Sequence, residues 1–85
     1  MNLHQLKIWP EYFQPLIEGR KTFELRKADR DYRVHDEIWF QEFDPKTQAY
    51  TGREAMAEIT YILDGPFVIP GMCLMSVILS PEVRQ

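Results

Sequence analysis

At 85 residues, with 45% hydrophobic and 27% charged side chains, the chain has the composition of an ordinary globular protein, which excludes intrinsic disorder. A chain this short forms one domain, spanning residues 1–85, and buries only about 60–65% of the surface that it exposes when unfolded. The formal net charge of −3 argues against a protein that coats nucleic acid through a general positive charge.

The first elements along the chain are a strand and a short helix. Residues 3–9 roughly alternate in polarity, which predicts a strand whose even-numbered side chains share one face. Pro10 suits the first position of a helix, because the missing N–H of proline would be unpaired there anyway. Apolar pairs spaced four residues apart follow, and Gly19 is a natural stop, so we expect a helix over residues 10–18.

A second alternating segment runs from Lys21 to Arg26 and predicts the second strand. Its alternation would place Phe23 and Leu25 on the inner face and Glu24 on the opposite face. Lys21 shares the parity of Phe23. We therefore expect its aliphatic part to pack at the mouth of the core and its ammonium group to stay in water.

Three further strands are expected at residues 37–43, 53–63 and 72–79. The last of them is apolar on both faces, as a strand covered on both sides should be, and it contains the single cysteine, Cys73. A lone cysteine excludes an intramolecular disulfide and favours a reducing compartment, and we interpret Cys73 as a small buried side chain. No stretch approaches the roughly 20 apolar residues of a membrane helix, so we expect a cytoplasmic protein with no membrane partner.

Five short strands separated by turn signals, with one short helix near the N-terminus, indicate an α+β domain. The spacing of the turn signals favours a closed or nearly closed barrel over an open sheet. We therefore expect a small, five-stranded, mainly antiparallel β-barrel.

Positive charge is concentrated between residues 20 and 33, although the whole chain is acidic. Six lysines and arginines against three carboxylates give this segment a charge of +3, and the remainder carries −6. A basic patch on an acidic body is typical of a focused anion site, and also of a solvated charged loop. The candidate ligand-binding residues are Lys21, Glu24, Arg26, Arg30, Arg33 and Trp39.

The remaining aromatic and titratable side chains are weaker candidates. Trp39 is the best candidate for stacking on a base, because its two neighbours fill the opposite face of its strand. His4 is expected to point inward and to form a hydrogen bond. The histidines His4 and His35 and the thiol of Cys73 do not have the spacing of metal ligands, so we expect neither a metal nor a cofactor.

The pattern Gly-x-Lys-x-x-Glu-x-Arg resembles the signature of the ASCH domains, a branch of the PUA-like β-barrels. It stands here as Gly19, Lys21, Glu24 and Arg26. Further blocks resemble the small bacterial and phage proteins of the DUF3850 family, and with them the similarity covers about residues 3–79. These blocks are His4-x-Leu6-Lys7, Pro10-Glu11-Tyr12-Phe13, Phe23-Glu24-Leu25-Arg26-Lys27, Asp29-Arg30 and Tyr50-Thr51-Gly52-Arg53. The resemblance implies a PUA-like barrel and an RNA or nucleotide ligand.

Three functions stay open at this point. In a binding module, Lys21 and Arg26 would contact phosphate and Glu24 a base or ribose edge, while Arg30 and Arg33 would extend the patch. An enzyme that cleaves RNA or modifies a nucleoside would use Lys21 as acid/base or electrostatic catalyst, with Glu24 as its partner. A phage-type protein-interaction module would expose an apolar patch. We favour binding, because a lysine paired with a carboxylate is a better phosphate ligand than general base.

Overall fold

The computed structural model of the protein describes residues 1–84, with the side chains of residues 1–81. These residues form the strands β1 (Leu3–Ile8), β2 (Phe23–Lys27), β3 (Glu37–Asp44), β4 (Ala49–Leu63) and β5 (Met72–Arg84), and the helix α1 (Pro10–Ile17). All the expected elements are therefore present, with β4 and β5 longer than predicted. No helix in the described part of the chain is long and apolar enough to cross a membrane.

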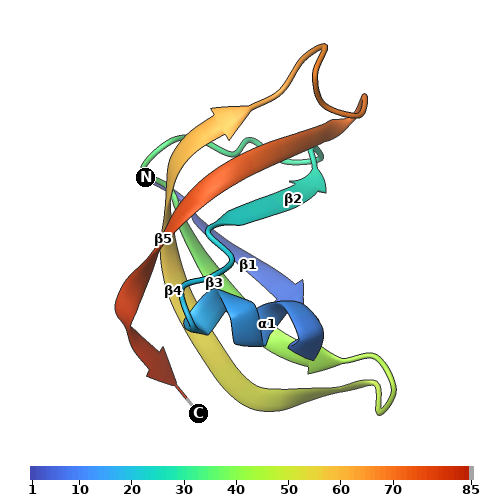
Figure 1. The fold of residues 1–85 in the computed structure, drawn as a ribbon, viewed down its shortest axis with the longest axis vertical. Coiled ribbons are helices and arrows are strands. Elements are labelled where there is room, and N and C mark those ends of the chain that lie inside the picture. The colour runs from blue at the N-terminus through green and yellow to red at the C-terminus, as the bar shows by residue number, and fades with distance from the viewer. Residues whose placement is uncertain (85) are drawn as a thin grey trace.

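The strands form one mixed sheet in the order β1-β3-β4-β5-β2. β1 runs parallel to β3, because the chain passes through α1 and β2 before it returns beside β1 in the same direction. Figure 1 shows this sheet curled into a half-barrel, with α1 lying near one end of β1. The five strands, the single short helix and the barrel-like curl are therefore confirmed, whereas the expected mainly antiparallel arrangement is wrong, because the sheet is mixed and only half closed. The alternation of side chains predicts where a strand lies, but it does not predict which strand becomes its neighbour.

The hydrophobic core fills the inner side of the half-barrel and is closed by α1. Alternate residues of the strands point into it, and α1 adds Phe13 and Leu16 from one face. The expectation for Cys73 is confirmed, since its side chain is buried in this core. The other buried apolar residues are Leu6, Ile8, Ile38, Phe40, Ala55, Ala57, Ile59, Met75 and Val77.

β2 has the opposite orientation to the one expected from its sequence. Glu24 is only 5% exposed, whereas Phe23 and Leu25 are about half exposed, at 51% and 46%. In the antiparallel pairing with β5, Glu24 lies opposite Met75, which is fully buried. Directly opposed residues share a face, so this register directs the carboxylate of Glu24 inward.

Asp36 ties the start of β1 to the loop that precedes β3. Its carboxylate accepts hydrogen bonds from the backbone N–H groups of Asn2 and Arg33, each at 3.0 Å. The Nε2 atom of His4 lies 2.8 Å from Asp36 Oδ2, which confirms the inward, hydrogen-bonded histidine. Burial by itself raises the pKa of Asp36, but the hydrogen bonds from Asn2, His4 and Arg33 outweigh burial, and the pKa lies below its ordinary value.

Removal of the Asp36 charge should weaken the fold and change its response to acid. Because the pKa is lower in the folded chain, this carboxylate stabilises the fold above its unfolded value of about 3.9, and the contribution is lost as the pH falls through the folded-state value. We expect Asp36→Asn to lower the free energy of unfolding at pH 7 by about 1–3 kcal/mol and to flatten its decline below about pH 5. Urea denaturation between pH 7 and pH 3 measures both effects.

Asp31→Asn is the control, because the side chain of Asp31 is 70% exposed and contacts only the exposed Arg33 among the described residues. It should leave both the stability and its pH dependence nearly unchanged. An Asp36→Asn variant with the same pH profile as the parent chain would contradict the role given to Asp36.

Candidate functional site

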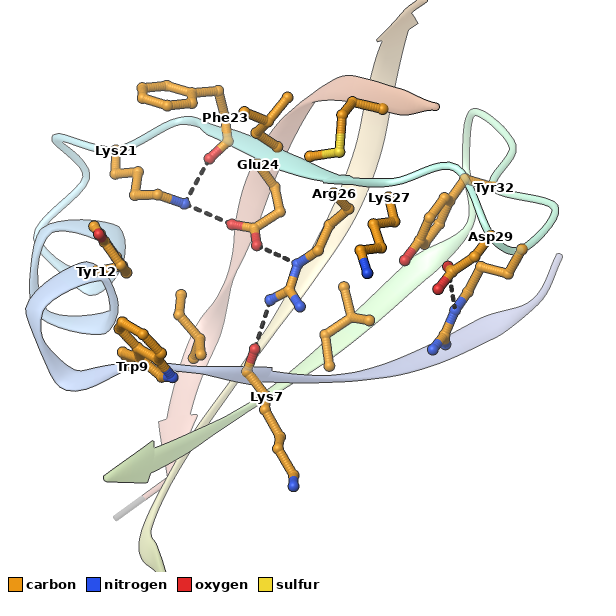
Figure 2. A pocket seen from close by; sticks show the side chains of 15 residues that line it. Lys7, Trp9, Tyr12, Lys21, Phe23, Glu24, Arg26, Lys27, Asp29 and Tyr32 are labelled. Atoms are coloured by element: carbon orange, nitrogen blue, oxygen red, sulfur yellow. Dashed lines mark hydrogen bonds and ion pairs between the residues drawn. The ribbon is translucent and has the colours of Figure 1, made fainter. Parts of the chain in front are cut away.

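A cleft of about 640 Å³ lies between the two edge strands, β1 and β2. It occupies the seam that the half-barrel leaves open. The start of α1 contributes one part of its wall and the loop after β2 another, as Figure 2 shows. The volume lies within the range of about 300–1,000 Å³ that is typical of small-molecule sites.

Glu24 lies between two cations on the wall of this cleft. Its Oε1 accepts a hydrogen bond from Nζ of Lys21 at 2.5 Å, and its Oε2 accepts one from Nε of Arg26 at 2.6 Å. We call these residues the Lys21–Glu24–Arg26 triad. The side chain of Lys21 is only 15% exposed, so the expected solvated ammonium group is wrong. Lys21 precedes β2, and the alternation of a strand therefore does not keep it away from Glu24.

The triad also joins the two edges of the sheet. Nη2 of Arg26 donates a hydrogen bond to the carbonyl oxygen of Lys7 on β1 at 2.6 Å, and Nζ of Lys21 donates one to the carbonyl of Phe23 at 2.8 Å (Figure 2). In the described chain, β1 and β2 are not neighbours in the sheet. The side chain of Arg26 therefore bridges a gap that no backbone ladder closes.

One end of the cleft is aromatic. Trp9 and Tyr12 are about half exposed, and their nearly parallel rings have centroids 6.3 Å apart with 21° between the planes. Trp39, the stacking candidate from the sequence, does not line the cleft, and its Nε1 donates a hydrogen bond to Glu54 instead. The position of Trp9 between β1 and α1, next to Pro10, is the feature of the sequence that could have indicated its role in the cleft.

The other end of the cleft is cationic. Lys27 is exposed, and its ammonium group forms no hydrogen bond or ion pair with any described residue. Nε of Arg30 lies 4.0 Å from Oδ1 of Asp29. Burial raises the pKa of Tyr32, which also lines this end, so its hydroxyl stays neutral. Sequence reasoning did not single out Lys27. Arg33, which it did select, lies outside the cleft and pairs with Asp31.

The cleft carries an excess of positive charge in a chain whose net charge is −3. Lys7 contributes its backbone, while its ammonium group lies outside, 4.4 Å from the ring centroid of Phe43. Among the other charged side chains that line the cleft, cations outnumber anions by two. They are Lys21, Arg26, Lys27 and Arg30 against Glu24 and Asp29.

A second apolar surface lies on the outer face of the sheet and meets the cleft at Leu25, which also lines the cleft. Leu25 of β2 is opposite Leu74 of β5, which is in turn opposite Leu63 of β4, so the three form one row. The loop before β5 adds Phe67, 89% exposed, and Ile69, 67% exposed. No described residue covers these two side chains. Exposed apolar surface of this kind is typical of contact sites.

The chain matches the domain of unknown function DUF3850 over residues 3–77 and belongs to this family, which confirms that resemblance. It is 36% identical over 62 residues to the "Uncharacterized 12.9 kDa protein in GpA 3'region" of Escherichia phage P2. The match covers 73% of this chain and 55% of that protein, so the chain spans about half the length of this relative. Every residue that lines the cleft falls within the family match.

Loss of the charge on Glu24 should destabilise the fold, because two cations would then face each other on the cleft wall without their shared carboxylate. We expect Glu24→Gln to lower the free energy of unfolding by about 2–4 kcal/mol, as for a broken buried ion pair. Glu18→Gln is the matched control, since Glu18 also pairs with an arginine, Arg20, but on the exposed surface. It should hardly change the stability in urea denaturation. Equal, small effects of the two substitutions would contradict a structural role for the triad.

Proposed function

We propose that this member of the DUF3850 family binds RNA or a nucleotide in the cleft between β1 and β2. The observation that carries the proposal is the combination of excess positive charge with exposed aromatic rings in one cleft. Cations supply affinity for phosphate, and aromatic rings stack on bases with little dependence on sequence. Such ligands are abundant in the cytoplasm, which is the location that the proposal requires.

In this proposal the triad is a pre-organised part of the binding surface. Glu24 holds Lys21 and Arg26 in position, and each cation has further N–H groups that a ligand can accept from. Side chains that are already ordered lose less conformational entropy when the ligand binds. Arg30, at the edge of the same cleft, extends the cationic surface.

We also propose that the fold is related to the ASCH and PUA-like barrels. The signature residues support this relation, because three of them form the triad. Gly19, the first of the signature, has a φ of +79°, a left-handed conformation that favours glycine, and it directs the chain from α1 toward Lys21. The pattern thus describes one site rather than scattered positions.

Two alternatives have weaker support. The enzymatic alternative requires a second acid/base group close to Lys21. Among the described residues, however, Nζ of Lys21 forms hydrogen bonds only with Glu24 and the carbonyl of Phe23. The protein-interaction alternative would use the outer apolar surface around Leu25 and Phe67. Because the charged and aromatic groups converge on the cleft instead, ligand binding is the function that we favour.

Amide chemical shifts test the location of the ligand directly. We expect single-stranded RNA oligomers and ribonucleoside monophosphates, titrated into labelled protein, to shift amides of β1 and β2. Lys21→Ala should weaken binding by about 1–3 kcal/mol, because it removes one cation from the cleft and one of the two partners that hold Glu24 in place. Lys46→Ala, an exposed lysine in the turn between β3 and β4, is the control.

The same samples distinguish the alternatives. Changes in amide chemical shift that are confined to residues 63–69 and to the outer face of the sheet would favour the protein-interaction module. Cleavage of RNA or modification of a nucleoside by the parent chain that disappears in Lys21→Ala would establish the enzyme instead.

Salt dependence provides a further test of phosphate contact. The cleft presents only a few cationic heads, so few counterions are released when a ligand binds. We expect the logarithm of the association constant for single-stranded RNA to fall with the logarithm of salt concentration with a slope of about −1 to −3. A slope near zero, measured by titration between low and physiological salt, would remove phosphate contact from the proposal.

A further inference from the structure

We infer that the cleft binds its ligand in one orientation. A base stacks on Trp9 and Tyr12, and a terminal phosphate binds between Lys27 and Arg30. This inference rests on the proposed function and specifies the ligand chemistry, a nucleoside that carries a phosphate monoester. Two observations carry it. They are the distribution of unused hydrogen-bond donors along the cleft and the separation of its two ends by Arg26.

The cations of the triad are already engaged by the protein. Lys21 donates hydrogen bonds to Glu24 and to the carbonyl of Phe23, and Arg26 donates to Glu24 and across the seam to the carbonyl of Lys7. A phosphate placed on them would compete with a carboxylate that is only 7% exposed. The triad is therefore the less favourable position for a full phosphate charge.

Lys27 and Arg30 are the less engaged cations. Within the described residues, Lys27 has no hydrogen-bond or ion-pair partner, and the contact of Arg30 with Asp29 is long, at 4.0 Å. Figure 2 shows Lys27 and Tyr32 on the same side of β2 as Arg26, directed toward β1. An ammonium group, a guanidinium group and a neutral phenol hydroxyl are all donors that suit a phosphate.

The guanidinium group of Arg26 divides the cleft between its two ends. Because it spans from β2 to the carbonyl of Lys7, Trp9 and Tyr12 lie to one side of it and Lys27 and Tyr32 to the other (Figure 2). The aromatic side offers faces for stacking and the other side offers donors. A nucleotide matches this arrangement in one orientation only.

The charge of the cleft favours a terminal phosphate over a phosphodiester. A phosphate monoester carries about 1.5 to 2 negative charges at pH 7. Lys27 and Arg30 against Asp29 give its end of the cleft an excess of one positive charge, and the triad adds a second positive charge from beside it. A phosphodiester inside an RNA chain carries one. The same monoester is found in a free nucleotide and at the phosphorylated end of an RNA, and the experiment separates these two sources.

Trp9 provides the reporter for the experiment. The chain contains two tryptophans, and Trp39 lies outside the cleft, so Trp39→Phe leaves Trp9 as the single tryptophan, which can be excited selectively over the tyrosines. In this background we would titrate the four ribonucleoside 5′-monophosphates, the corresponding nucleosides and the methyl esters of the monophosphates. We expect quenching by all of them, and binding of the monophosphates about ten- to a hundredfold tighter than that of the nucleosides and tighter than that of the esters.

Substitutions at the cationic end test the direction of binding. Lys27→Ala and Arg30→Ala should each weaken binding of the monophosphate about tenfold and leave the affinity for the nucleoside unchanged. Arg33→Ala is the matched control, because Arg33 lies near Arg30 in the chain but pairs with Asp31 outside the cleft. Trp9→Leu should weaken the binding of all the ligands by a similar factor, and calorimetry measures these affinities.

The two sources are distinguished by comparing the affinities of three ligands. These are a short RNA with a 5′-phosphate, the same RNA with a 5′-hydroxyl, and the free monophosphate. Tighter binding of the phosphorylated RNA than of the free nucleotide identifies an RNA end, and the reverse order identifies the free nucleotide. Equal affinity for monophosphate and nucleoside, or an unchanged preference in Lys27→Ala and Arg30→Ala, would overturn the inference and leave the proposed function standing. Absence of binding by every nucleotide and RNA would overturn both.

Discussion

The hydrogen bond from Arg26 to the carbonyl of Lys7 connects two strands that the sheet leaves unpaired. The curled sheet brings β1 and β2 to opposite sides of a seam, and edge strands of this kind present backbone groups without partners. A side chain spans the seam in place of a backbone ladder. The bridge thus connects the two edges across the cleft that lies between them.

The position of that bridge depends on Glu24, whose burial is tolerable only because two cations contact it. The carboxylate orients Arg26 toward β1 and folds Lys21 back from the end of α1. If the cleft binds the proposed ligand, stability and binding are therefore coupled at the triad, whereas Lys27 and Arg30 would contact the ligand without a role in holding the fold together. Arg26 and Lys27 are neighbours in the sequence, but we expect Arg26 to stabilise the fold and Lys27 to contact the ligand.

Much of the fold could be predicted from local patterns, and the errors have identifiable causes. The alternation in β1 correctly indicated an inward His4, and the Pro10 and Gly19 signals located the helix to within one residue of its C-terminal end. The same rule failed for β2, because it treats a charged side chain as solvent-facing. It cannot take into account that Lys21 and Arg26 neutralise Glu24 on the inner face.

The sequence by itself determined the positions of the strands and the helix, the buried cysteine and the basic segment that contributes one wall of the cleft. These features depend on side-chain periodicity and turn preferences, which act over a few neighbouring residues. Only the tertiary structure decided the parallel pairing of β1 with β3, the inward face of Glu24, and the presence of Trp9 rather than Trp39 in the cleft. Each of these depends on contacts between distant parts of the chain, as between Arg26 and Lys7, and such contacts follow from strand register rather than from local preference.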